Sequence, residues 1–156
     1  MNEMNRIESF KVNHDLLDRG IYISRIDGDV ITYDIRMKKP NDGDYLNSDA
    51  MHTIEHIFAT FVRNSLFKNS VLYFGPMGCR TGFYLLMRDD VKKEDVINLI
   101  KDAFSFVAGF EGDIPGNSRI ECGNYLEHDI SGAKNEAKAM ESVLKDWKAC
   151  DMYYKE

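Results

Sequence analysis

The stretch Ile21–Met37, IYISRIDGDVITYDIRM, is the part of the sequence that decides the fold. Asp27 and Gly28 form a turn signal between two runs rich in β-branched and aromatic residues, which predicts a β-hairpin. In the second run apolar side chains alternate with polar ones, and the alternation assigns Arg36 to the polar face. The stretch therefore predicts an antiparallel sheet.

The rest of the chain adds a second strand pair and three helices to this hairpin. Strand-like runs at 68–76 and 82–90 are joined through the tight turn GPMGCRTG. Helical periodicity covers about 50–66, then 92–110 with an end near Gly109, and a last helix within 129–150 with a possible cap at Ser131. This order predicts an α+β fold, an antiparallel sheet with helices packed on one face. With 156 residues and no linker or repeat, we expect a single domain over 1–156.

Composition and charge exclude several partners. The net charge is −6 and no basic cluster occurs, which argues against a nucleic-acid partner. The N-terminus lacks a signal-peptide pattern, and no run approaches the about 20 apolar residues that span a membrane. Three scattered cysteines, Cys79, Cys122 and Cys150, fit a reducing compartment rather than a disulfide framework. We therefore expect a cytoplasmic protein in which Cys150, near the C-terminus, is a bystander.

The motif HTIEH lies within SDAMHTIEHIFA, Ser48–Ala59, in the first predicted helix. His52 and His56 are one turn apart, a spacing that lets two imidazoles hold one ion, and Glu55 lies on the same face. H-x-x-E-H is also the inverted form of the zinc-protease motif. The alternative is a solvated helix edge, because two ligands do not complete a site.

A third ligand must come from elsewhere in the chain. His14, His128, the cysteines and many carboxylates are all candidates. Cys122, in RIECGNY, is expected on a loop or strand end, and a His₂Cys set with an open fourth position is a catalytic arrangement that suits Zn²⁺ or Fe²⁺. The alternative for Cys122 is a small buried hydrophobe.

Cys79 has different surroundings, because three glycines lie close to it and Arg80 follows it. The glycines allow close approach of a ligand, and the arginine is a cation near the thiol. Such a thiol can act as a nucleophile or as a proton shuttle. A packed turn cysteine is the alternative.

These motifs together resemble a known family. HTIEH, GPMGCRTGFY and ECGNY, in this order, with IESFKVNH near the N-terminus and YDIRMKKPN at the second strand, closely resemble the S-ribosylhomocysteine lyases of the LuxS family. The resemblance covers the chain from about Ile7 to the final helix. It implies an α+β fold with a four-stranded antiparallel sheet, and a homodimer with two active sites at the interface.

The resemblance also assigns roles to residues. It implies that His52, His56 and Cys122 bind one divalent metal per subunit, with water or substrate in the fourth place. Fe²⁺ is the expected ion, with Zn²⁺ or Co²⁺ as workable substitutes. Glu55 and Cys79 are implied to be the proton-transfer pair.

Contacts to the sugar part of the substrate are implied for Ser9, His14 and Arg36. In the family the N-terminal segment that carries the first two of these reaches the partner's site. The chain departs from the family at Tyr73-Phe74-Gly75, where members often have Asp-Ile-Ser before Pro-Met-Gly-Cys. The usual aspartate helps to hold the homocysteine end, so the pocket for the amino-acid end is left unassigned.

The implied reaction cleaves the thioether of S-ribosylhomocysteine to homocysteine and 4,5-dihydroxy-2,3-pentanedione, the precursor of the quorum signal autoinducer-2. Two enediolate shifts move the carbonyl towards the sulfur before β-elimination, with the metal as Lewis acid. A metallopeptidase of the inverted-motif class would need a downstream third ligand, usually a glutamate, and a much larger chain. A structural zinc module would need four ligands, and we expect no fourth with sensible spacing.

Overall fold

The computed structural model describes residues 3–156 and contains a four-stranded antiparallel sheet with the order β1-β2-β4-β3. The strands are β1 (Gly20–Asp27), β2 (Val30–Arg36), β3 (Val71–Pro76) and β4 (Gly82–Arg88). The hairpin predicted from the sequence is confirmed, although Asp27 already pairs with Val30 and the turn residues are Gly28 and Asp29. Gly28 has a φ of 59°, a value that a residue without Cβ adopts at little cost.

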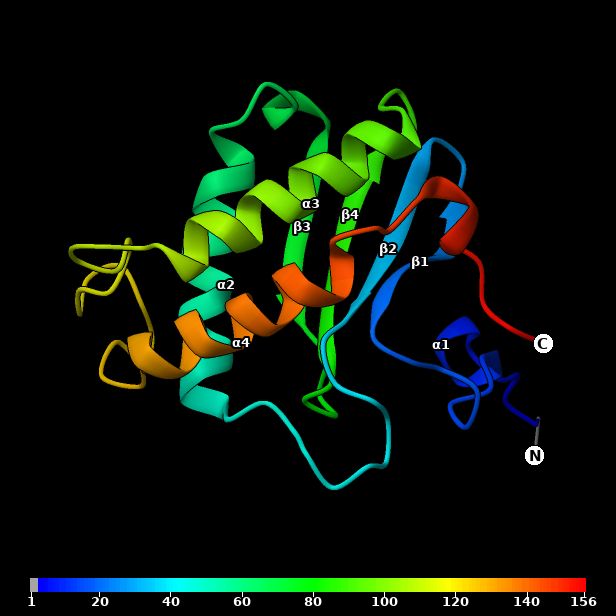
Figure 1. Cartoon of the computed structure of the whole chain (residues 1–156), viewed down its shortest axis with the longest axis horizontal. Coiled ribbons are helices and arrows are strands. Elements are labelled where there is room, and N and C mark those ends of the chain that lie inside the picture. Colours follow the sequence, from blue (N-terminus) through cyan, green and yellow to red (C-terminus); the bar gives the residue numbers. More distant parts are fainter. Residues whose placement is uncertain (1–2) are drawn as a thin grey trace.

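Three long helices pack together beside the sheet (Figure 1). They are α2 (Ser48–Arg63), α3 (Lys93–Ala108) and α4 (Ile130–Leu144). A short helix that the sequence did not predict, α1 (Glu8–Lys11), lies away from them next to β1 (Figure 1). The α+β class is therefore confirmed. None of the helices within residues 3–156 combines the length and the apolar character that crossing a lipid bilayer requires.

The core joins α2 to the apolar face of the sheet. Phe58 of α2 stacks on Phe74 of β3 with a centroid distance of 4.1 Å, and Phe74 stacks on Phe83 of β4 at 4.7 Å. Ile54 and Ile57 of the same helix are completely buried. This packing fixes the rotation of α2 and so the direction in which its histidines point.

The predicted helix at about 50–66 is confirmed as α2, which starts two residues earlier and ends three residues earlier than predicted. Asn47 caps the helix by accepting a hydrogen bond from the backbone N–H of Asp49. The helix ends at Arg63, because the side chains of Asn64 and Ser65 donate to backbone carbonyls of the last turns. Leu66, included in the predicted helix, is 99% exposed and gains no burial that would extend it.

The start of α4 differs from the prediction in a way that matters for the site. The cap is Asp129, whose carboxylate accepts from the N–H of Gly132, so the predicted cap at Ser131 is wrong. The N–H of Asp129 donates to the hydroxyl of Thr53 on α2, at 2.9 Å. This contact, across 76 residues of sequence, ties the two helices together. The predicted end of α3 at Gly109 is confirmed.

The C-terminal segment packs against the second face of the sheet at one end. Asp34 of β2 is paired with Tyr22 and Tyr84 on its neighbours, and the carbonyl of Met152 accepts from the β1 backbone. The ring of Tyr154 stacks on Tyr22 with a centroid distance of 5.2 Å. The alternation predicted for β2 is therefore present, but its polar side chains are buried here rather than hydrated.

Candidate active site

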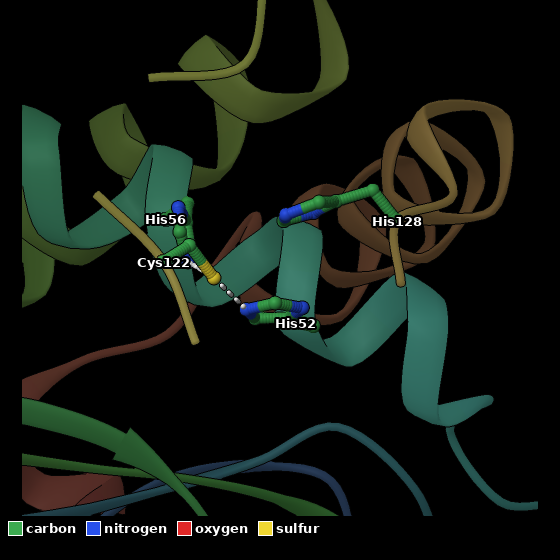
Figure 2. A group of neighbouring side chains, drawn as sticks. All are labelled: His52, His56, Cys122 and His128. Atoms are coloured by element: carbon green, nitrogen blue, oxygen red, sulfur yellow. Dashed lines mark hydrogen bonds between the residues drawn. The ribbon is translucent and has the colours of Figure 1, made fainter. Parts of the chain in front are cut away.

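The two histidines of α2 and Cys122 converge on one point (Figure 2). The sulfur of Cys122 lies 3.4 Å from Nε2 of His52 and 3.8 Å from Nε2 of His56. A tetrahedral ion with a metal–sulfur bond of about 2.3 Å and metal–nitrogen bonds of about 2.0–2.1 Å would hold such atoms about 3.6 Å apart. The three donors therefore stand at the spacing of a metal site.

Backbone carbonyls orient both imidazoles of α2. Nδ1 of His52 lies 2.6 Å from the carbonyl oxygen of Glu127, and Nδ1 of His56 lies 2.8 Å from that of Pro115. A carbonyl can only accept, so both Nδ1 atoms carry the proton and both Nε2 atoms present a lone pair to the cluster. This tautomer is the one that a metal ligand needs, and the residues fit a bound divalent ion.

The segment between α3 and α4 supplies the rest of the cluster. Cys122 lies on it, as predicted, and Gly116 passes beside His56 with a φ of 71°. A Cβ at Gly116 would stand 3.3 Å from Nδ1 of His56 and would have to adopt a left-handed conformation as well. Because this segment covers the histidine face of α2, the alternative of a solvated helix edge is wrong.

His128 is the fourth member of the cluster (Figure 2). Its donor atom and those of the other three residues all lie within 4.8 Å of one another. Its ring stacks on that of His52 with a centroid distance of 4.1 Å and an angle of 18°. Burial, with the neighbouring His52 and His56, lowers the pKa of His128 and favours the neutral ring. His128 is therefore a fourth potential donor beside the cluster, which the sequence did not indicate because 72 residues separate it from His56.

A second group of predicted residues lines a pocket of about 350 Å³ at the end of β2 and β4. Ser9, His14, Arg36 and Cys79 all contribute to its wall. The three residues that the resemblance assigns to sugar binding thus line one pocket with Cys79 of the same chain. Within residues 3–156, Glu55 and the metal cluster are not part of this wall.

Arg36 connects the pocket to a buried network. Its Nε and Nη2 donate to the carboxylate of Asp34 at 3.1 and 2.6 Å, and Nη1 donates to the hydroxyl of Thr81 at 2.8 Å. That hydroxyl lies 3.1 Å from the sulfur of Cys79. Burial opposes the charge of Arg36, but Asp34 outweighs it and leaves the pKa of the guanidinium raised. A cation held in this way is fixed in position as well as in charge.

The cation that hydrogen bonds connect to the thiol is therefore Arg36, through Thr81, whereas the sequence indicated the adjacent Arg80. The guanidinium of Arg80 donates to the carbonyl of Leu46 at 3.3 Å and lies over the ring of Tyr45. Arg80, whose φ is 61°, thus directs its guanidinium to Leu46 and Tyr45.

Three residues of this network were not singled out from the sequence. The alternation in β2 could have indicated Asp34, which shares a face with Arg36, and Thr81 belongs to the quoted turn. Tyr154 donates to Asp34 at 2.6 Å from the C-terminal segment, where no motif marks it.

At Tyr73-Phe74-Gly75, where the sequence departs from the pattern of the family it resembles, the residues fit one another. The side chain of Tyr73 folds over Gly75, and a Cβ at that glycine would collide with the phenol. The larger residue and the glycine are therefore a matched pair. They precede Pro76, which lines the pocket of Cys79.

The α+β fold, the histidine–cysteine cluster and the separate thiol pocket define a candidate metalloenzyme. Residues 7–150 match the family described as "LuxS: S-Ribosylhomocysteinase (LuxS)", and the chain belongs to this family.

Relatives of nearly the same length support the assignment. A protein of Finegoldia magna named S-ribosylhomocysteine lyase is 47% identical over 98% of this chain and 100% of its own length. A protein of Phocaeicola vulgatus with the same name is 48% identical over 97% of this chain and 98% of its own. The metallopeptidase hypothesis has no support from these matches.

Proposed function

We propose that this protein is a carbon–sulfur lyase that cleaves S-ribosylhomocysteine to homocysteine and 4,5-dihydroxy-2,3-pentanedione. The family match over residues 7–150 carries the proposal. The spacing and tautomers of the donors around Cys122 support it independently, because this chemistry calls for an ion with a free position.

The metal ligands are His52 and His56, each through Nε2, and Cys122 through sulfur. A bound divalent ion supplies Lewis acidity that stabilises negative charge on substrate oxygen. We assign Fe²⁺ as the ion, with Zn²⁺ and Co²⁺ as working substitutes, because imidazole and thiolate accept all three. The protein fixes the ligands before any ion arrives, through the carbonyls that accept from both Nδ1 atoms.

Glu55 and Cys79 move the protons. The carbonyl of the opened sugar migrates from C1 to C2 and then to C3, and each shift removes a proton from one carbon and returns one to its neighbour. A base then takes the proton from C4, the C4–C5 double bond forms and the C5–sulfur bond breaks, and the resulting enol tautomerises to the diketone by gaining a proton at C5. The leaving thiolate takes up a proton as homocysteine, so no oxidant or reductant is needed. Ser9, His14 and Arg36 hold the sugar during these steps.

In the proposed homodimer, shared sites bring the pocket of Cys79 and the metal cluster together on one substrate. The pocket of Cys79 and the metal cluster have separate walls within one chain, yet the reaction needs both on one substrate. Ile7 and Phe10 beside the pocket are 55% and 67% exposed, which suits a segment that meets another protomer. In this arrangement Ser9 and His14 bring the pocket of one protomer to the cluster of its partner.

The proposal also includes the cellular location of the protein and the use of its product. We assign the protein to the cytoplasm, because the described cysteines are free and the thiol of Cys79 must stay reduced. The substrate is a small molecule, and no nucleic acid or membrane takes part. The product has two possible uses, as a quorum signal or in homocysteine recycling within the methyl cycle.

The proposal is tested by incubating the purified, metal-loaded protein with S-ribosylhomocysteine while free thiol is titrated. We expect one thiol per substrate consumed and about one ion per chain by elemental analysis. Cys122→Ala is expected to lose most of the ion and all measurable turnover while it stays folded, because the core does not depend on the metal. Cys150→Ala, a change at an exposed cysteine, is the control. A fully loaded protein that leaves the substrate intact overturns the proposal, and full occupancy in Cys122→Ala removes this residue from the ligand set.

A further inference from the structure

One atom of the metal cluster has no role in the proposed function. Nε2 of His128 is buried and has no hydrogen-bond partner within residues 3–156. The ring belongs to the group whose potential ligand atoms lie within 4.8 Å of one another, and it points towards the other three side chains (Figure 2), so we place this nitrogen beside the cluster. A buried polar atom without a partner costs free energy unless something arrives to pair with it.

The hydroxyl of Thr53 fixes the tautomer of His128. It accepts from the N–H of Asp129 at 2.9 Å and donates to the carbonyl of Asp49 at 3.1 Å. Its remaining lone pair faces Nδ1 of His128, at 2.9 Å. Nδ1 therefore carries the proton, and Nε2 presents a lone pair. The opposite tautomer would bury an N–H with no acceptor.

The stacking of the rings determines what this lone pair can reach. His128 and His52 are close to parallel, at 18°, with centroids 4.1 Å apart. The lone pair of an imidazole nitrogen lies in the plane of its ring, and two near-parallel planes do not meet at one nearby ion. If His52 binds the ion, the lone pair on Nε2 of His128 points past the ion and not at it. His128 is therefore an acceptor beside the cluster and not a fourth ligand.

We infer that Nε2 of His128 accepts a hydrogen bond from a hydroxyl of the sugar when that hydroxyl enters the open position of the cluster. This inference rests on the proposed function, since it names a polyhydroxylated substrate and a bound ion. His128 touches the substrate and not the ion. Thr53 and Asp129 act through it, and the unusual start of α4 holds the acceptor in place.

Cobalt-loaded variants test this inference. His128→Phe keeps a flat ring on His52 but has no nitrogen, and His128→Gln returns an acceptor oxygen near the former Nε2. In His128→Phe we expect cobalt affinity, measured by chelator competition, to stay within about threefold of the wild type, because no ligand is lost. We expect kcat/KM for S-ribosylhomocysteine to fall about 10- to 100-fold, with partial recovery in His128→Gln.

The visible bands of bound Co²⁺ provide a readout that does not depend on turnover. S-ribosylhomocysteine is expected to shift these bands in the wild type and to require a higher concentration to do so in His128→Phe. A hundredfold loss of cobalt affinity with changed bands in the substrate-free variant would make His128 a ligand and overturn the inference. Unchanged kcat/KM in a folded His128→Phe overturns it as well, while leaving the lyase function intact. Wild-type protein whose cobalt bands respond to the substrate, but which releases no thiol, contradicts the lyase function alone. His128→Leu, which also removes the acceptor nitrogen, carries the same tests if His128→Phe does not fold.

Discussion

The metal cluster and the pocket of Cys79 are built in opposite ways. Two of the cluster donors lie on one helix, one turn apart, and backbone carbonyls hold their rings in place. The pocket draws its wall from three distant segments, and its buried cation is held by side chains alone. A metal site needs distances fixed to a few tenths of an ångström, which backbone supplies. A sugar site needs many directed contacts, which separate segments can bring together.

The first prediction concerns the proposed acid–base pair, Glu55 on the helix of the cluster histidines and Cys79 in the pocket. We expect the loss of either residue to reduce turnover in the same way. Glu55→Gln and Cys79→Ser each remove a base and leave the metal ligands unchanged. We expect both variants to keep the ion and to lose about 10²- to 10⁴-fold in kcat, with a small effect on KM. Thiol-release kinetics and elemental analysis provide the measurements.

Cys150→Ser is the matched control, because it makes the same chemical change at an exposed cysteine away from both regions. Normal turnover in Cys79→Ser would end the role of the thiol, since a serine hydroxyl is far too weak an acid to replace it. Loss of the ion from Glu55→Gln would instead place this carboxylate in the metal shell.

The second prediction tests whether the two regions meet between protomers. A Cys79→Ala chain has an intact cluster, and a Glu55→Gln chain has an intact pocket. Mixing the two inactive proteins under conditions of subunit exchange is expected to restore about a quarter of wild-type activity, since half of the dimers are mixed and each has one intact site.

The pairing of variants makes this test specific. His14→Ala mixed with Cys79→Ala is expected to stay inactive, because both residues line the same pocket of one chain. Recovery in this control but not in the first mixture would mean that His14 and Cys79 serve different sites. Absence of recovery in both mixtures after confirmed exchange argues against a shared site.

Local signals predicted the cluster better than the pocket. The spacing of His52 and His56 and the cap at Asn47 are properties of one helix, so the sequence contains them directly. The partner of Cys79 is set by the strand register that brings Arg36 opposite Gly82 and beside Thr81, and the sequence led instead to the adjacent Arg80.

One long-range contact and one local competition account for the other differences. The expected cap of α4 at Ser131 fails because Asp129 is anchored to α2 through Thr53, a contact across 76 residues. The predicted extension of α2 to Leu66 fails because polar side chains compete for the last carbonyls. The partner of Asp129 lies far away in the sequence, whereas Asn64 and Ser65 lie within the predicted helix and end it locally.

The smallest effect is expected at Tyr154, which joins the C-terminal segment to the buried network of Arg36. Its hydroxyl donates to Asp34 at 2.6 Å, and Asp34 in turn holds Arg36. Tyr154→Phe removes one donor from a buried carboxylate that keeps its arginine, so we expect a loss of about 1 kcal/mol in the free energy of unfolding. Tyr153→Phe is the control, because that neighbouring ring is 55% exposed and its hydroxyl meets only an exposed lysine, so its stability should stay within about 0.5 kcal/mol of the wild type. Urea unfolding measures both changes. A rise in KM for Tyr154→Phe, with kcat unchanged, would show that Tyr154 also positions Arg36 for the sugar, whereas equal stability of the two variants would mean that the hydrogen bond to Asp34 adds nothing to the fold.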